Sequence, residues 1–241
     1  MVYPKAVVFD LDGTLVDTAG DLHLILSGLM SEEGLPTPPL AAMRDMVGDG
    51  AKVLLARAFA SAGVTPDPAR LEEIYALFLE RYTAEPCRRS TLYPGAAELL
   101  ATLAAEGCGI GLCTNKPQRP SELLLEALGV MDRFGAIVGG DTLPVRKPDS
   151  AHLVAVLERL GAGPGDAVMV GDSRNDVVTA QAAGVPCVLV SFGYTTVPAR
   201  ELGAAMVIDR LEELPPVLAA RPWAALTKGD PLRTSAPGPG A

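Results

Sequence analysis

The chain has 241 residues, of which 49% are hydrophobic and 5% aromatic, so it can bury one large core or two smaller ones. Acidic residues outnumber basic residues by 29 to 20, and the formal net charge is -9. A phosphate polymer or an anionic membrane would be repelled on average by this charge. We therefore expect neither nucleic acid nor a membrane surface as a partner.

The lengths of the apolar runs and the positions of the cysteines indicate the cellular compartment of the protein. The first apolar run, residues 6–9, is too short for a secretory signal, and no run approaches the roughly 20 apolar residues of a membrane span. The cysteines at positions 87, 108, 113 and 187 contain no CxxC pair and are typical of free thiols in a reducing compartment. We expect a cytoplasmic protein.

Short apolar runs alternate with longer amphipathic stretches along most of the chain, which is typical of a parallel α/β sheet. Between the runs, apolar residues recur at intervals of three and four, as in Leu99, Leu100 and Leu103, and this spacing predicts helices. The expected fold class is α/β, with helices on both faces of a parallel sheet. The expected strands cover residues 6–9, 109–113, 136–138, 167–170, 186–190 and 206–208.

The interval between the first and second runs is too long for a single crossover helix. It contains helical patterns around Leu22 to Leu29, Val53 to Phe59 and Leu71 to Tyr82, but no strand signal. We expect a helical domain over residues 18–89, inserted into a core of residues 1–17 and 90–220, with hinges near 16–18 and 89–94. Residues 221–241 are rich in proline and lack periodicity, which predicts a flexible tail.

The strongest chemical signal is the segment from Asp10 to Thr14, Asp-Leu-Asp-Gly-Thr, which directly follows the first expected strand. In open α/β sheets, ligand sites form beyond the carboxyl ends of the strands. By itself the segment has a structural alternative, an acidic turn with a glycine in the left-handed region. Its interpretation therefore depends on the residues at the ends of the other strands.

Polar groups come after the later runs in a matching way. Thr114 and Asn115 end the second run, Lys147 precedes a proline, and a Gly-Asp-Ser-Arg-Asn-Asp segment places Asp172 and Asp176 after the fourth run. Taken singly, these groups are equally well explained as a turn, a solvated helix start and a helix N-cap. Their joint occurrence at strand ends favours one shared site.

These segments resemble, in order, the motifs of the haloacid-dehalogenase superfamily, whose core is a Rossmann-like sheet. The resemblance implies that Asp10 is a nucleophile that becomes phosphorylated, and that Asp12 serves as general acid and then general base. It also implies that Thr114, the backbone of Asn115 and the ammonium group of Lys147 bind the transferring phosphate. The expected catalytic residues are Asp10, Asp12, Thr114 and Lys147.

The resemblance further implies bound Mg²⁺, held by the side chains of Asp10 and Asp172 and by the backbone carbonyl of Asp12. A carboxylate that attacks a phosphate ester meets like-charge repulsion, and Mg²⁺ prefers carboxylate and phosphate oxygens. Asp176 lies four residues after Asp172, so on a helix it is either a further ligand or a partner of the ligands. We also expect Thr14 to orient Asp12.

In this superfamily the inserted segment corresponds to a cap that closes over the site and contacts the leaving group. We expect its loop with Gly48, Asp49 and Gly50 to face the core and to bring backbone amides close to a small anion. An ordinary helix-breaking turn is the structural alternative. Arg44 and Lys52 flank the loop and are either carboxylate ligands or solvated.

Several motifs together are most similar to the enzymes of this superfamily that hydrolyse 2-phosphoglycolate. The implied partner is a small phosphorylated metabolite, and the implied products are glycolate and phosphate. A phosphatase for sugar phosphates or pyrophosphate, a phosphomutase, and an inactive binding protein on the same fold are the alternatives. A monomer and a homodimer are both compatible with the sequence.

Overall fold

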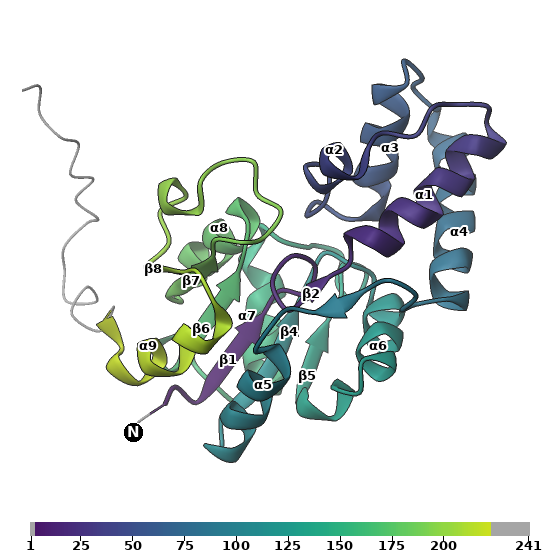
Figure 1. The fold of residues 1–241 in the computed structure, drawn as a ribbon. Coiled ribbons are helices and arrows are strands. Elements are labelled where there is room, and N and C mark those ends of the chain that lie inside the picture. Colours follow the sequence, from purple (N-terminus) through teal and green to yellow (C-terminus); the bar gives the residue numbers. More distant parts are fainter. Residues whose placement is uncertain (1–2, 223–241) are drawn as a thin grey trace, which may run out of the picture.

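The computed structural model describes residues 3–222, so the expected tail lies almost wholly outside the described residues. Within them, six parallel strands form one sheet in the order β5-β4-β1-β6-β7-β8 (Figure 1). This arrangement confirms the α/β fold class. The strands are β1 (Ala6–Phe9), β4 (Gly109–Cys113), β5 (Ala136–Val138), β6 (Ala167–Gly171), β7 (Cys187–Val190) and β8 (Met206–Ile208).

Both faces of the sheet are apolar and covered by helices, because successive side chains of a strand point to opposite faces. Val7 and Phe9 of β1 belong to one buried cluster, and Ala6 and Val8 belong to the other. The first cluster is covered by α5 (Ala96–Ala105), α6 (Gln118–Ala127) and α9 (Leu214–Ala220), and the second by α7 (Ser150–Arg159) and α8 (Arg174–Ala182). Short 3₁₀ helices cover Met131–Arg133, Pro164–Asp166, Ala199–Glu201 and Leu211–Glu213.

The insertion between β1 and β4 is helical, as expected, and packs around an apolar cluster of its own. In Figure 1 its helices stand apart from the layered sheet and its covering helices. The five-residue α2 was not predicted, because it is too short to show a periodic pattern. No helix within residues 3–222 is long and apolar enough to cross a membrane. The helices are α1 (Ala19–Glu32), α2 (Leu40–Arg44), α3 (Ala51–Ser61) and α4 (Pro68–Ala84).

The chain enters and leaves the insertion through a two-stranded antiparallel ribbon of β2 (Val16–Asp17) and β3 (Thr91–Leu92). These are the segments that the sequence indicated as hinges, although strands of two residues give no alternation to detect. The pairing keeps the two crossings side by side at the edge of the sheet core.

A buried carboxylate reinforces this junction from the first helix of the insertion. Asp21 accepts hydrogen bonds from the backbone N–H groups of Arg88, Arg89 and Ser90 at 3.1, 2.8 and 2.8 Å, and from the Ser90 hydroxyl at 2.6 Å. Asp21 is only 1% exposed, so water cannot take its place as the acceptor for these N–H and O–H groups. The start of the insertion is thereby tied to its end.

The variant Asp21→Asn tests this tie. It replaces one accepting oxygen by an NH₂ group that faces N–H donors, so the free energy of unfolding should fall by about 2–3 kcal/mol. Urea denaturation measures the change. The matched control Asp45→Asn alters an exposed residue and should stay within about 0.5 kcal/mol of the wild type. Equal stability of the two variants would contradict the assigned role of Asp21.

Candidate active site

Strand pairing brings the expected site residues together. β1 pairs with β4 on one side and with β6 on the other, and all three strands run in the same direction. Asp10, Thr114 and Asp172, which directly follow β1, β4 and β6, therefore meet at one edge of the sheet. All three side chains are buried. Segments that are distant in the chain thus form one site.

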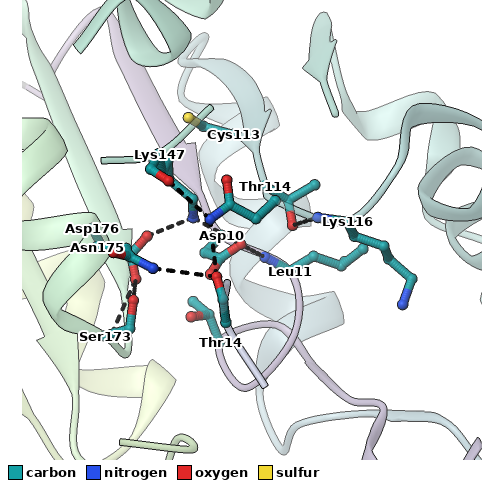
Figure 2. Close-up of polar contacts among 12 residues, drawn as sticks. Asp10, Leu11, Thr14, Cys113, Thr114, Lys116, Lys147, Ser173, Asn175 and Asp176 are labelled. Carbon is teal, nitrogen blue, oxygen red and sulfur yellow. Dashed lines mark hydrogen bonds and ion pairs between the residues drawn. The ribbon is translucent and has the colours of Figure 1, made fainter. Parts of the chain in front are cut away.

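Lys147 lies at the centre of this site, on the connection between β5 and α7. Its Nζ is 3.0 Å from Asp10 Oδ1 and 2.6 Å from Asp176 Oδ1 (Figure 2). Burial lowers the pKa of Lys147, but the carboxylates of Asp10 and Asp176 outweigh this effect and raise the pKa above its usual value. The side chain is therefore a fixed positive charge.

The carboxylates of Asp10, Asp172 and Asp176 form a compact cluster, with one oxygen of each within 4.8 Å of the others. Burial raises the pKa of Asp10 to about 6, with Lys147 opposing the shift and the neighbouring carboxylates adding to it. Burial and then repulsion from Asp176 and Asp10 raise the pKa of Asp172. One lysine does not balance three carboxylates, so this oxygen-rich cluster fits a hard divalent cation such as Mg²⁺.

Asp176 has both carboxylate oxygens engaged within the protein. Oδ1 contacts Lys147, while Oδ2 accepts hydrogen bonds from the Ser173 hydroxyl at 2.7 Å and from the backbone N–H groups of Ser173 and Asp172 at 3.0 and 3.2 Å. With Ser173 it forms a capping box at the start of α8. Asp176 therefore holds Lys147 and the backbone of Asp172 in place.

Asp172 is packed between two glycines. A Cβ added at Gly13 would lie 2.4 Å from Asp172 Oδ2, and one added at Gly193 would lie 2.1 Å from Asp172 Cβ. Gly13 also has a φ of +85°, in the left-handed region. Asp172 Oδ2 accepts a hydrogen bond from the Tyr194 N–H at 2.6 Å. The site has room for this carboxylate only because both neighbours lack side chains.

The surroundings of Asp12 differ from the sequence prediction. Thr14 Oγ1 lies 3.5 Å from Asp172 Oδ1, so Thr14 contacts Asp172 and the prediction that it orients Asp12 is wrong. Asp12 Oδ1 instead lies 3.2 Å from Lys116 Nζ. The sequence did not indicate Lys116 as a site residue, because a lysine in a turn after a strand is usually solvated. Its side chain is 5% exposed.

Thr114 and Asn115 occupy the end of β4. The Thr114 hydroxyl oxygen accepts a hydrogen bond from the Lys116 N–H at 3.2 Å, which leaves its proton available for a ligand (Figure 2). The Asn115 side-chain NH₂ donates to the carbonyls of Gly48 and Lys147 at 2.9 and 3.1 Å. Asn115 therefore joins the loop of the insertion to the backbone of the central lysine.

The loop containing Gly48, Asp49 and Gly50 lies against the core, as expected, but its contacts are different. Gly48 turns its carbonyl, not its amide, toward the NH₂ groups of Asn115 and Asn175. Asp49 accepts a hydrogen bond from Asn175 at 2.7 Å and pairs with Arg57. The two glycines line a cavity between the insertion and the core, whereas Asp49 does not.

The two cations that flank this loop are paired elsewhere. Arg44 lies 2.8 Å from Asp17, and Lys52 lies 2.6 Å from Glu72 and 4.8 Å from the ring centroid of Tyr75. Both side chains are exposed, and neither lines the cavity.

The cavity between the core and the insertion has a volume of about 40 Å³. Its polar wall comes from the core and consists of Asp10, Asp12, Thr114, Asn115 and Lys116. Its opposite wall is mainly apolar and includes Leu54, Phe78, Leu79 and Tyr82 from α3 and α4. A polar reactive floor under an apolar lid is typical of small-molecule sites.

The sequence matches a family model, the haloacid dehalogenase-like hydrolase family, over residues 4–184. It is 47% identical over 215 residues to a phosphoglycolate phosphatase of Rhodospirillum rubrum, covering 88% of this chain and 89% of that protein. A phosphoglycolate phosphatase of Caulobacter vibrioides is 43% identical over 209 residues, covering 87% of this chain and 88% of that protein.

Comparison with solved structures indicates the same family. A solved structure of a predicted phosphoglycolate phosphatase from Haemophilus somnus superposes with a TM-score of 0.84 and 29% identity, covering 90% of this chain and 99% of that one. CbbY of Rhodobacter sphaeroides, solved with phosphate, gives a TM-score of 0.75 and 26% identity over 88% of this chain and 96% of that one. The chain belongs to the haloacid dehalogenase-like hydrolase family.

Proposed function

We propose that this phosphatase hydrolyses 2-phosphoglycolate to glycolate and phosphate through a phosphorylated Asp10, with Mg²⁺ as its cofactor. The observation that carries the proposal is the buried Lys147, which pairs with Asp10 and Asp176 next to the cavity that Asp10 lines. The names of the Rhodospirillum and Caulobacter relatives support the choice of substrate.

Asp10 is suited to attack phosphorus with its second oxygen. Oδ1 accepts a hydrogen bond from the Leu11 N–H at 2.7 Å and contacts Lys147, whereas Oδ2 has no hydrogen bond within residues 3–222. When Oδ2 bonds to phosphorus, the bond from phosphorus to the ester oxygen breaks. The Thr114 hydroxyl donates a hydrogen bond to a phosphoryl oxygen, and the Lys147 ammonium group offsets the negative charge.

Asp12 completes the proposed reaction from its place in the cavity wall. In its acid form it gives a proton to the departing alkoxide, which leaves as glycolate. As a carboxylate it then takes a proton from water, the resulting hydroxide attacks the phosphorus, and the bond between phosphorus and Asp10 Oδ2 breaks. Phosphate is released, and both carboxyl groups return to their starting states.

The residues that would hold Mg²⁺ are Asp10 and Asp172 through their side chains and Asp12 through its carbonyl. When bound, this cation lowers the repulsion between the nucleophile and the phosphoryl group. We assign Asp176 to positioning, because Lys147, Ser173 and the backbone of Asp172 already occupy its oxygens.

We propose that residues 18–89 act as a cap on a core of residues 1–17 and 90–220. The loop contacts of Asn115 and Asn175 hold the cap against the core and exclude bulk water from the site during the transfer of the phosphoryl group to Asp10. The cysteines are free thiols, which supports a reducing, cytoplasmic location.

A panel of phosphate esters tests the substrate. With Mg²⁺, kcat/KM for 2-phosphoglycolate should exceed that for sugar phosphates and pyrophosphate by at least about tenfold, because a misfit in a binding pocket costs about 1–3 kcal/mol. EDTA should abolish the activity, and added Mg²⁺ should restore it. A higher kcat/KM for a sugar phosphate would overturn the substrate, and conversion of one sugar phosphate isomer to another would indicate a mutase.

Acid trapping during turnover tests the nucleophile. Peptide mass mapping of the wild type should locate the phosphoryl group on the peptide that contains Asp10. The variant Asp10→Asn should trap no phosphoryl group and should lose roughly 10⁴-fold or more in kcat, with an unchanged circular dichroism spectrum. The control Asp45→Asn should trap as the wild type does. A label on another side chain would refute this assignment.

Steady-state kinetics of Asn175→Ala test cap closure. The variant removes the hydrogen bonds from Asn175 to Gly48 and Asp49, so the closed state should be less populated and KM should rise by about three- to tenfold. Arg174→Ala alters the exposed neighbouring residue and serves as the matched control. An unchanged KM in Asn175→Ala would show that these contacts do not control access.

A further inference from the structure

The proposed substrate carries a second anionic group, because its leaving group has a carboxylate beside the ester oxygen. Lys147 is already paired with Asp10 and Asp176. A different cationic or hydrogen-bonding group is therefore needed to bind the carboxylate of the leaving group. Among the cavity-lining residues of the described chain, Lys116 is the one lysine or arginine. Arg44 and Lys52, which the sequence suggested for this role, are paired with Asp17 and Glu72 outside the cavity.

Lys116 lies where a leaving group would be. Its Nζ is 3.2 Å from Asp12 Oδ1, the proposed proton donor to the leaving alkoxide. In the view of Figure 2 its side chain extends away from Asp10 on the side opposite to Lys147. The two buried lysines therefore contact different carboxylates, Lys147 the proposed nucleophile Asp10 and Lys116 the proposed general acid Asp12.

The cap contributes a second group at this place. Lys116 Nζ lies 4.1 Å from the ring centroid of Tyr82, which comes from α4. The Tyr82 hydroxyl is buried and has no hydrogen-bond partner within residues 3–222, although Tyr82 lines the cavity. An unpaired buried hydroxyl costs free energy unless a ligand satisfies it.

Both groups are of the type that binds an anion. Lys116 has an ammonium group with three N–H donors, one of which faces Asp12. Tyr82 has a phenol group whose O–H can donate a hydrogen bond.

We propose that Lys116 and Tyr82 form the binding site for the carboxylate of the leaving group and thereby select anionic leaving groups. The Lys116 ammonium group pairs with the carboxylate, and the Tyr82 hydroxyl donates a hydrogen bond to it. Because Lys116 comes from the core and Tyr82 from the cap, the pair is complete only when the cap is closed. This inference rests on the proposed function and names its specificity-determining residues.

A pair of esters that differ only in this charge provides the test. We would measure kcat/KM for 2-phosphoglycolate and for its uncharged amide, 2-phosphoglycolamide, and take their ratio. The ratio cancels losses that affect both esters, such as a weaker general acid after Asp12 loses its partner. Lys116→Met should lower the ratio by roughly 10- to 100-fold, since a hydrogen bond to a charged group contributes about 1.5–3 kcal/mol.

Two further variants serve as a second test and as a control. Tyr82→Phe keeps the ring above Lys116 and removes only the hydroxyl, so it should lower the ratio by roughly three- to tenfold. It also provides the test if Lys116→Met does not fold. Lys52→Met removes a cap cation that does not line the cavity, and its ratio should equal that of the wild type. Unchanged ratios in Lys116→Met and Tyr82→Phe would overturn the proposal.

A second ester pair separates this inference from the choice of substrate. 3-Phosphoglycerate has a carboxylate in its leaving group, whereas glycerol 3-phosphate has an uncharged one. If 2-phosphoglycolate is a poor substrate but Lys116→Met removes a preference for 3-phosphoglycerate, the substrate is refuted and the carboxylate site is supported. If the wild type prefers neither charged ester, the carboxylate site is refuted.

Discussion

The structure depends on one electrostatic constraint, the packing of three buried carboxylates around a single ammonium group. Lys147 contacts Asp10 and Asp176, while Asp172 completes the cluster without a lysine of its own. Buried like charges separate unless rigid backbone holds them together. Here the backbone is the central part of a parallel sheet covered by helices on both faces, and the charge that Lys147 leaves unbalanced is what a divalent cation would neutralise.

The space for this cluster depends on backbone as much as on charge. Asp172 fits because Gly13 and Gly193 have no side chains, and Asp176 fixes both Lys147 and the start of α8. The same carboxylate that caps a helix therefore positions the central lysine. Stability of the fold and geometry of the site are not separable here, since β1 and β6, which lead into the site, are also buried along their whole length.

In the proposed mechanism, the catalytic groups and the groups that select the substrate come from different parts of the chain. The core supplies the carboxylates, Thr114 and both buried lysines, whereas the insertion supplies an apolar lid and the Tyr82 hydroxyl. Asn115 connects them, because its side chain binds the cap loop at Gly48 and the backbone of Lys147 at the same time. The loop of the insertion and the backbone of the central lysine are thus linked through one amide group.

The sequence by itself determined the strands, the helical insertion and the residues at the strand ends, because apolar periodicity and strand-end motifs are local properties. It did not reveal α2 or the β2–β3 ribbon, which are too short for a pattern. Only the tertiary structure decided which polar groups meet: Thr14 with Asp172, the Gly48 carbonyl with Asn115, and Lys116 with Asp12 across 104 positions. A lysine in a turn has the same local sequence whether it is solvated or buried, and the contacts with Asp12 and the Tyr82 ring that surround Lys116 come from distant parts of the chain.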